Sequence, residues 1–405
     1  MSDPTPPHMP GLRDASERQS AIMQLAGDLA ARFSDRVAQT DPQSLFPLDN
    51  YRELHEAGYL RLALPTEYGG EGADVFDMVL AQEILARGDA STALVTGMHF
   101  ALLGRVADGA AWPRDLMAHI CTTLARDGGT INNCVTEAEL GSISRGGLPS
   151  TVAEHTDGGW LITGRKIFVT GAPVLRFLAT AVVLPPSDAA PDGELVSAIV
   201  EGCSPGLSIE DTWSGALGLR GCGNYAVNYQ AVFVPDARIV ERVRIGGERK
   251  RPGTSGWNLP LAAVYLGIGQ AACDAACQYA NNRVPAALGT PIAGQPHIQQ
   301  WIGEMDVTLR AARAVLHDTA RAWVQRSAPP AALAPSIAAA KYLCTNAACT
   351  VTETALRVAG GFSMTRSLPL ERYFRDARGG LFQPPQDDLA LGMIGRAALE
   401  SERGT

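Results

Sequence analysis

The sequence predicts an α+β protein in which an N-terminal α-helical domain, a small antiparallel β-barrel or sandwich domain, and a C-terminal four-helix bundle follow one another. Three observations predict this class. Apolar residues recur at intervals of three and four before Gly128, as they do on amphipathic helices. Short runs rich in β-branched and aromatic residues follow, and long Ala-rich helical segments return after Pro235. Because helices and strands do not alternate and no GxGxxG joins a strand to a helix, a Rossmann domain is not expected.

The N-terminal domain is expected over residues 16–127. A Pro- and Gly-rich loop, Leu64–Asp74, separates its second and third helices. Residues 1–15 carry four prolines and are expected to form a disordered arm. They lack the basic start and apolar stretch of a signal peptide. The expected helices are Ala21–Phe33, Tyr51–Ala57, Val75–Gly88 and Thr92–Val106.

The two later domains are expected over residues 128–240 and 241–405. The turn Asp157-Gly158-Gly159 predicts a hairpin in the first of them. Its expected strands are Thr151–Val152, Trp160–Val169, Phe177–Leu184, Ser197–Val200, Leu207–Ile209 and Tyr225–Val234. Four long helices favour an antiparallel bundle in the second, and they are Leu259–Asn282, Pro296–Arg326, Ala331–Ala359 and Asp388–Leu399.

Composition excludes several classes of function. The 405 residues carry a net charge of -8, and no Lys/Arg-rich stripe could neutralise nucleic-acid phosphates. No apolar run reaches the roughly 18 residues that span a bilayer, so no membrane segment is expected. The eight cysteines form no CxxC or Cys/His cluster, so no metal site is expected and a reducing cytoplasm fits.

Seven segments, in consistent order and spacing, resemble motifs of the acyl-CoA dehydrogenase superfamily. They are LPTEYGGEG (64–72), AQEILARGDAST (81–92), CVTEAELGS (134–142), GRKIFVTGA (164–172), LGLRGCGNYAVNYQAVFVP (217–235), RVPAALGTPIAGQPHIQ (283–299) and AGGFSMTRSLPLERYFRDAR (359–378). The resemblance implies FAD as cofactor and an acyl-CoA or related thioester as substrate. It also implies a homodimer or homotetramer.

Within this resemblance, five residues match positions around the flavin ring. Val135, Thr136, Ser142 and Thr170 match groups that hydrogen-bond the pyrimidine edge, where reduction places negative charge. Phe168 matches an aromatic residue that covers one edge of the ring. The structural alternative is that the hydroxyls only cap a turn and that Phe168 belongs to the core.

A second set matches positions near the FAD diphosphate. Arg283 matches an arginine that the family supplies from a neighbouring subunit, and a guanidinium can bind phosphate in bidentate fashion. Leu288 takes the place of a phenylalanine of the family. Gly360 and Gly361 match a turn where the backbone approaches the cofactor. Arg357 replaces a glutamine and is expected either to contact phosphate or to lie on a solvated helix face.

The segment RDARGGLFQPPQDDLALGMIGR (375–396) departs from the family at its catalytic position. The family removes an α-proton with a glutamate that here corresponds to Pro384, counted from either side of the loop. Proline lacks both the carboxylate and the backbone N–H that polarises the thioester carbonyl. A second branch keeps its base at the position of Trp257, which is not acidic either.

Other residues are candidates to replace this base. Asp387 follows the loop, although Asp387 and Asp388 also suit the first turn of the last helix. His99 lies on a helix that in the family runs beside the substrate channel, and its structural alternative is a satisfied core histidine. Glu137 and Glu139 flank the flavin loop and are expected to point away from the ring.

Three functions remain open at this point. The first is α,β-dehydrogenation of an acyl thioester with hydride transfer to flavin N5, with an electron-transfer flavoprotein as acceptor. The second is a flavin-dependent monooxygenase supplied by a flavin reductase, because that chemistry needs no α-proton acceptor. The third is a catalytically degenerate flavoprotein. Dehydrogenation leads because it is the commonest chemistry on this fold.

Overall fold

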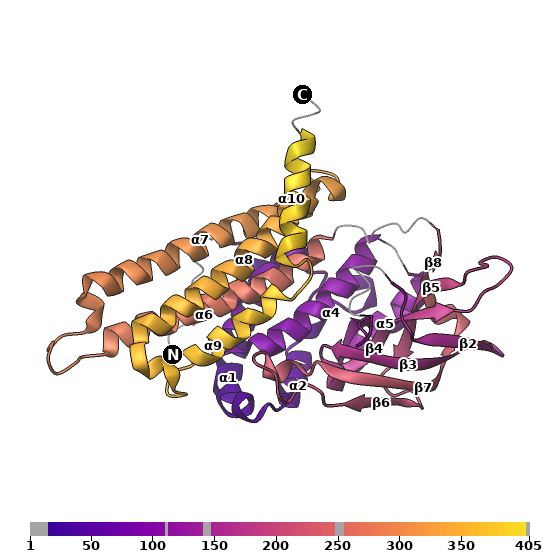
Figure 1. Cartoon of the computed structure of the whole chain (residues 1–405), viewed down its shortest axis with the longest axis horizontal. Helices are drawn as coiled ribbons and strands as arrows, with labels where there is room; N and C mark the ends of the chain where they lie inside the picture. The colour runs from indigo at the N-terminus through magenta and orange to yellow at the C-terminus, as the bar shows by residue number, and fades with distance from the viewer. Residues whose placement is uncertain (1–14, 110–111, 141–146, 248–254, 402–405) are drawn as a thin grey trace.

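The computed structural model describes residues 15–109, 112–140, 147–247 and 255–401. Helices, a mostly antiparallel sheet and further helices follow one another along the chain, so the predicted fold class is confirmed (Figure 1). Two expectations lie outside the described residues: the flavin-contacting role of Ser142, and nearly all of the N-terminal arm.

The described part of the N-terminal domain contains five α-helices, one more than expected. Asp74 caps α3 with a 2.9 Å bond from the Asp77 N–H, which fixes where this helix begins. Helices α3 and α4 are buried on nearly every side because α1, α6 and the sheet surround them. The additional helix, α5, packs one apolar face on the sheet. The bounds are α1 Glu17–Thr40, α2 Leu48–Glu56, α3 Val75–Gly88, α4 Ala90–Gly109 and α5 Arg114–Asp127.

In the residues that the structure describes, eight strands form one sheet in the order β6-β7-β3-β2-β4-β5-β8, with β1 paired to β4. Both β1 and β2 pair with β4 in parallel, and the other pairs are antiparallel as predicted. The last strand crosses the expected boundary at residue 240, because its residues extend the sheet edge beside β5. The bounds are β1 Thr130–Cys134, β2 Val152–Thr156, β3 Gly159–Val169, β4 Leu175–Leu184, β5 Glu194–Glu201, β6 Leu207–Glu210, β7 Tyr225–Pro235 and β8 Ile239–Arg244.

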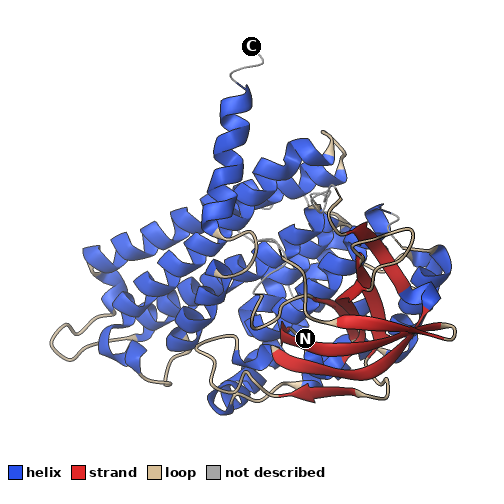
Figure 2. Ribbon diagram, turned by 45° about the vertical axis from the view of Figure 1, so that its right-hand side comes forward, coloured by secondary structure: helices blue, strands red, loops and turns tan. Residues whose placement is uncertain are grey.

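In the C-terminal domain three long helices lie side by side, and a short one packs against two of them (Figure 1). The expected fourth member, α10, projects away from the others (Figure 2). Its Leu389, Leu391 and Leu399 are 41%, 49% and 69% exposed, so this chain alone does not bury them. The bounds are α6 Leu259–Asn282, α7 Pro296–Val324, α8 Pro330–Ala359, α9 Leu370–Ala377 and α10 Asp387–Ser401.

One segment, Gly256–Asn282, is long and apolar enough by composition to cross a membrane. Its most apolar window is 83% buried inside the protein, as is typical of the core helix of a soluble fold. Within the described ranges, no group of three or more His, Cys, Asp or Glu side chains is placed to hold a metal ion.

Candidate functional site

The ends of β1 and β3 bring the residues matched to the flavin ring close together. The Ile167 N–H donates to the Thr136 carbonyl at 2.9 Å, which ties the segment after β1 to β3. Asn132 Nδ2 donates to the Thr170 carbonyl at 3.1 Å. The Thr170 hydroxyl itself has no hydrogen-bond partner in the described part of the chain, so it is available to a ligand. We call Val135, Thr136, Phe168 and Thr170 the ring-end group.

Phe168 is presented to solvent by an irregularity in its strand. The β3–β7 register shifts between Lys166 and Val169, and Phe168 adopts a φ of 54°. Its side chain is 56% exposed, with its ring 6.0 Å from that of Trp213 at an interplanar angle of 81°. The alternative that Phe168 is a core residue is therefore wrong, because more than half of its large aromatic surface is exposed and free to pack against a ligand.

A buried ion pair holds the segment after β1 in place. Lys166 Nζ lies 2.6 Å from Glu137 Oε1, with the two side chains 0% and 5% exposed. Ser150 and Thr151 each donate a backbone N–H and a hydroxyl to the same carboxylate. Burial raises the pKa of Glu137, but the bonds from Lys166, Thr151 and Ser150 outweigh it and lower the pKa to about 2. Glu137 thus faces β3 and the residues just before β2, and these bonds fix the segment that carries Thr136.

Lys166 was not singled out from the sequence. The available signal was its rarity, because Lys166, Lys250 and Lys341 are the only lysines among 34 basic residues. A lysine kept in such an arginine-rich chain is a reason to look for a role that guanidinium cannot fill.

The residues matched to the FAD diphosphate line one hollow of about 570 Å³. Arg283, Arg357, Gly360 and Gly361 all border it, and a Cβ on either glycine would meet no atom within 4 Å. The Arg283 guanidinium lies 4.9 Å from the centre of the Phe362 ring. No carboxylate of the described residues lies within 4.0 Å of this guanidinium, so its charge is available. We call these residues and Phe362 the phosphate-end group.

Two side chains of this hollow refine the sequence interpretation. Arg357 pairs with Glu353 one helical turn away at 2.7 Å, with a side chain that is 62% exposed, which favours the solvated alternative. Leu288 borders the hollow where the family has a phenylalanine, and Phe362 provides an aromatic surface instead. The sequence signal for Phe362 was a large apolar residue directly after a Gly-Gly turn.

The two groups lie at opposite ends of α6 within one chain. Next to Thr170, the Gly171 N–H donates to the Cys222 carbonyl at 2.9 Å. The same segment brings Leu219 beside Gly379, and Gly379 in turn lies close to Tyr265 near the start of α6. Arg283 follows the last residue of α6, roughly 27 Å further along the helix than Tyr265. In Figure 1 the loop after α6 lies at the end of the bundle far from the sheet.

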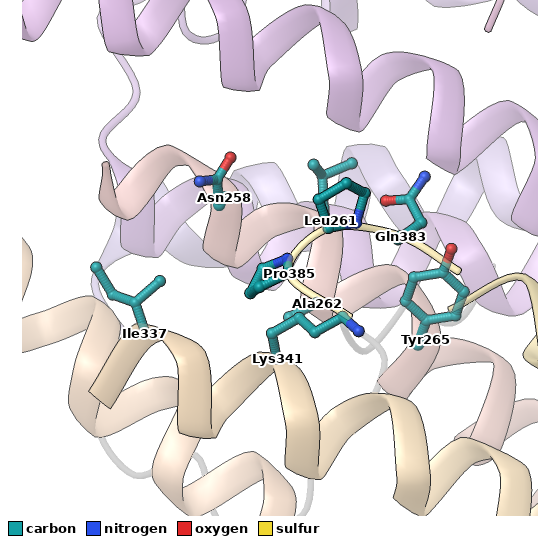
Figure 3. Close-up of a pocket in the computed structure, with 9 residues that line it drawn as sticks. Asn258, Leu261, Ala262, Tyr265, Ile337, Lys341, Gln383 and Pro385 are labelled. Carbon is teal, nitrogen blue, oxygen red and sulfur yellow. The ribbon is translucent and has the colours of Figure 1, made fainter. Parts of the chain in front are cut away.

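The loop around Pro384 closes a cavity of about 30 Å³ near the start of α6 (Figure 3). Gly379 and Gly380 let the loop approach closely, because a Cβ on Gly380 would come within 3.0 Å of the Tyr265 ring. The described lining contains no carboxylate. It consists of Asn258, Leu261, Ala262, Tyr265, Ile337, Lys341, Gln383, Pro384 and Pro385.

Trp257 and His99, two of the alternative base positions, make hydrogen bonds that hold the fold together. Trp257 is buried, and its indole N–H donates to Asp108 at 3.1 Å. His99 is fully buried, with Nδ1 accepting from the Ile131 N–H at 3.2 Å and Nε2 lying 3.1 Å from the Leu60 carbonyl. Burial lowers the pKa of His99 to about 4, so the ring is neutral with its proton on Nε2. These contacts favour the core alternative for His99.

Asp387 lies behind the cavity wall. Its Oδ2 accepts from Asn346 Nδ2 at 3.0 Å, and its Oδ1 lies 3.7 Å from Nζ of the lining residue Lys341. Both Asp387 and Asp388 belong to the first turn of α10, where a negative charge interacts favourably with the helix dipole and stabilises the helix. Of the expected acidic candidates, Asp387 is therefore the one beside the cavity.

The Arg375-Asp376 pair anchors the loop that carries Pro384. Arg375 binds Asp41 and Glu371, each with a 2.6 Å contact. Asp376 Oδ1 accepts from the Leu219 N–H at 2.6 Å, which joins the β domain to α9. Burial raises the pKa of Asp376 to about 7, against the opposing effect of the Leu219 N–H.

Asp376 is expected to make stability depend on pH. Between about pH 4 and pH 7 the folded protein keeps a proton that the unfolded chain releases, so stability falls as pH rises, by about 1.4 kcal/mol per unit. Asp376→Asn keeps the acceptor for Leu219 and removes the titration. Denaturant unfolding at about pH 5 and pH 7 should show a smaller pH dependence in this variant. Equal slopes in the two proteins would contradict the shifted pKa.

Comparison with known proteins agrees with this geometry. Residues 16–109, 132–232 and 259–399 match the N-terminal, middle and C-terminal domains of acyl-CoA dehydrogenase. The chain is 38% identical over 387 residues to a putative acyl-CoA dehydrogenase, YdbM, of Bacillus subtilis (strain 168), covering 95% of this chain and 98% of the relative.

Two solved structures share the fold. Butyryl-CoA dehydrogenase from Megasphaera elsdenii matches with a TM-score of 0.82 and 23% identity, covering 96% of this chain and 99% of the other. A nitrososynthase from Micromonospora carbonacea var. africana matches with a TM-score of 0.81 and 24% identity, covering 95% and 97%.

The fold and the two groups define a flavin-dependent oxidoreductase. The Thr170 hydroxyl, which has no partner among the described residues, the exposed Phe168 ring and the open surface over Gly360 fit a flavin at the ring-end and phosphate-end groups. The chain belongs to the acyl-CoA dehydrogenase family.

Proposed function

We propose that the protein is an FAD-dependent enzyme that oxidises an acyl thioester by α,β-dehydrogenation, with hydride transfer to flavin N5. The cavity at Pro384 carries this proposal, because Pro384, which lines it, matches the family's catalytic position, and because Leu219, close to the ring-end group, lies beside Gly379 of the same loop. The bound flavin would supply the hydride acceptor. The Bacillus subtilis relative, itself named as a putative acyl-CoA dehydrogenase, supports the same class of substrate.

Asp387 is the proton acceptor in this proposal. It is the carboxylate beside a lining residue, and its Oδ1 has no hydrogen-bond partner in the described chain. A general base must come within hydrogen-bond reach of the proton it removes, and catalytic contacts often tighten only when substrate binds.

A flavin-dependent monooxygenase is the second candidate, and one observation favours it. The cavity lining within the described residues holds no carboxylate, and oxygen-dependent flavin chemistry requires no α-proton acceptor. The nitrososynthase shows that a protein other than an acyl-CoA dehydrogenase uses this fold. In this case a flavin reductase replaces the electron-transfer flavoprotein as partner.

The proposed assembly is a homodimer or homotetramer in the cytoplasm. The phosphate-end group of one subunit would complete the flavin site at the ring-end group of another, since the two groups lie far apart in one chain. Exposed apolar side chains would be covered by such contacts, including Met364 at 81% and Phe382 at 76%.

Anaerobic titration of the flavin-loaded protein with acyl-CoAs of varied length tests the reaction. At least one thioester is expected to bleach the flavin, and Asp387→Asn is expected to slow bleaching about 100-fold. The monooxygenase would be established instead if no thioester bleached the flavin and if the reduced protein consumed oxygen and formed an oxygenated product. Neither activity would leave a catalytically degenerate flavoprotein.

A further inference from the structure

The cavity at Pro384, the position that matches the family's catalytic glutamate, is lined by the side chain of Lys341. Lys341 projects from α8 into the lining, and Figure 3 shows its side chain below Pro385 with the ammonium end toward Tyr265. The loop residues Gln383 and Pro384 border the same space. The local charge at this position is therefore inverted relative to a site built around glutamate.

Lys341 is buried with one ionic partner, Asp387, and without a hydrogen bond among the described residues. Its side chain is 10% exposed, and Nζ has no hydrogen-bond partner in the described parts of the chain. The nearest carboxylate oxygen, Asp387 Oδ1, is 3.7 Å away, beyond hydrogen-bonding distance, and is itself unpartnered. An ammonium has three donors, and a buried charge is costly unless it is paired and hydrogen-bonded. The described structure thus holds a buried, ion-paired lysine whose hydrogen-bond donors are unused.

Neutral donors line the same cavity. The Tyr265 hydroxyl is buried and has no hydrogen-bond partner among the described residues, and burial raises its pKa, so it stays protonated. The side-chain amides of Asn258 and Gln383 also line the cavity. An ammonium, a phenol and two amides can each donate a hydrogen bond to an oxygen-centred anion.

The size of the cavity limits what this set can bind. About 30 Å³ exceeds the roughly 10–15 Å³ that one water needs, so the space admits a group about as large as a carboxylate. The group bound here is thus a small anionic part of a substrate, close to the reacting carbons.

We propose that Lys341, with Tyr265, forms an anion-binding subsite in place of the catalytic carboxylate, and that the acyl thioester substrate carries a second carboxylate which this subsite binds. The thioester part of this inference rests on the proposed function, whereas the anion subsite does not. Asp387 competes with the incoming carboxylate for the same ammonium, since both would approach Nζ.

Binding measurements on the flavin-loaded protein test the subsite without relying on turnover. Malonyl-CoA and succinyl-CoA are compared with acetyl-CoA and butyryl-CoA by calorimetry and by perturbation of the flavin spectrum. The carboxylated thioesters are expected to bind wild-type protein at least 10-fold more tightly. Lys341→Met should abolish this preference, and Lys341→Arg should keep part of it. Asp387→Asn should strengthen binding of malonyl-CoA by removing the competing charge.

Flavin content and thermal unfolding of each variant report whether it folds. If Lys341→Met does not fold, Lys341→Arg and Asp387→Asn still decide the outcome. Equal affinity for neutral and carboxylated thioesters in wild-type protein would overturn the subsite, as would a preference that Lys341→Met retains. Free malonate that binds in a Lys341-dependent way, when no thioester binds, would support the subsite and overturn the proposed thioester function.

Discussion

Replacing Arg283 with alanine is expected to weaken FAD binding about 30-fold, while the protein remains folded. The guanidinium borders the phosphate-end hollow, rests on the Phe362 ring and has no carboxylate partner in the described chain. A charge-assisted hydrogen bond to phosphate contributes about 2 kcal/mol, which corresponds to that change in the dissociation constant. Titration of apoprotein with FAD, followed by quenching of flavin fluorescence, measures it.

Arg310→Ala is the matched control for this prediction. Arg310 lies on α7, pairs with Asp306 at 2.6 Å and does not border the hollow. Its removal deletes the same charge from an exposed helix and should leave FAD affinity unchanged. Equal affinities in Arg283→Ala and wild-type protein would contradict the role of the phosphate-end group. Mixed oligomers add a second measurement. When subunits of a ring-end variant are combined with subunits of Arg283→Ala, some flavin sites should receive an intact ring-end group from one subunit and an intact phosphate-end group from the other, and FAD binding should partly return.

Local patterns in the sequence were sufficient to predict the order of domains and most of the elements. The helix Leu259–Asn282 has the predicted bounds because its apolar residues and the following loop are local signals. The strand Ile239–Arg244 was missed. Half of its side chains face solvent at the sheet edge, so its apolar pattern is weak. The departure of α10 from the bundle was also missed, since a helical period does not say which surface a helix packs on.

Site residues could be predicted from the sequence only where they belong to a family motif. Arg283 and Gly360 match one family motif each, and the fold brings them to the same hollow. Lys341 lies 43 positions before Pro384 on another helix, and only the packing of α8 against the loop reveals that they share a cavity. Lys166 and Glu137 are likewise 29 positions apart. Contacts between distant segments depend on tertiary packing, which no local pattern specifies.

Lys166→Met is expected to produce the largest loss of stability of the variants considered, about 3 kcal/mol near neutral pH. Removing one member of a buried ion pair costs about 3–5 kcal/mol because the other charge stays buried, and the bonds from Ser150 and Thr151 keep this case at the lower end. Flavin binding should weaken as well, because the bonds of Glu137 fix the segment that carries Thr136. Denaturant unfolding and FAD titration of the same samples measure both effects.

The pH dependence and a double variant separate this ion pair from a simple packing defect. The pKa of Glu137 is lowered to about 2 from its ordinary 4.5, so the stability that the pair contributes is complete above about pH 4.5 and is lost as pH falls toward 2. The difference between Lys166→Met and wild-type protein should therefore shrink in acid. Glu137→Gln combined with Lys166→Met should recover part of the loss, since no unpaired charge then remains. The opposite result would be a loss of stability that is constant with pH and additive in the double variant. It would mean that Lys166 acts through its aliphatic stem, and that the segment after β1 does not need the buried charges to hold the ring-end group in place.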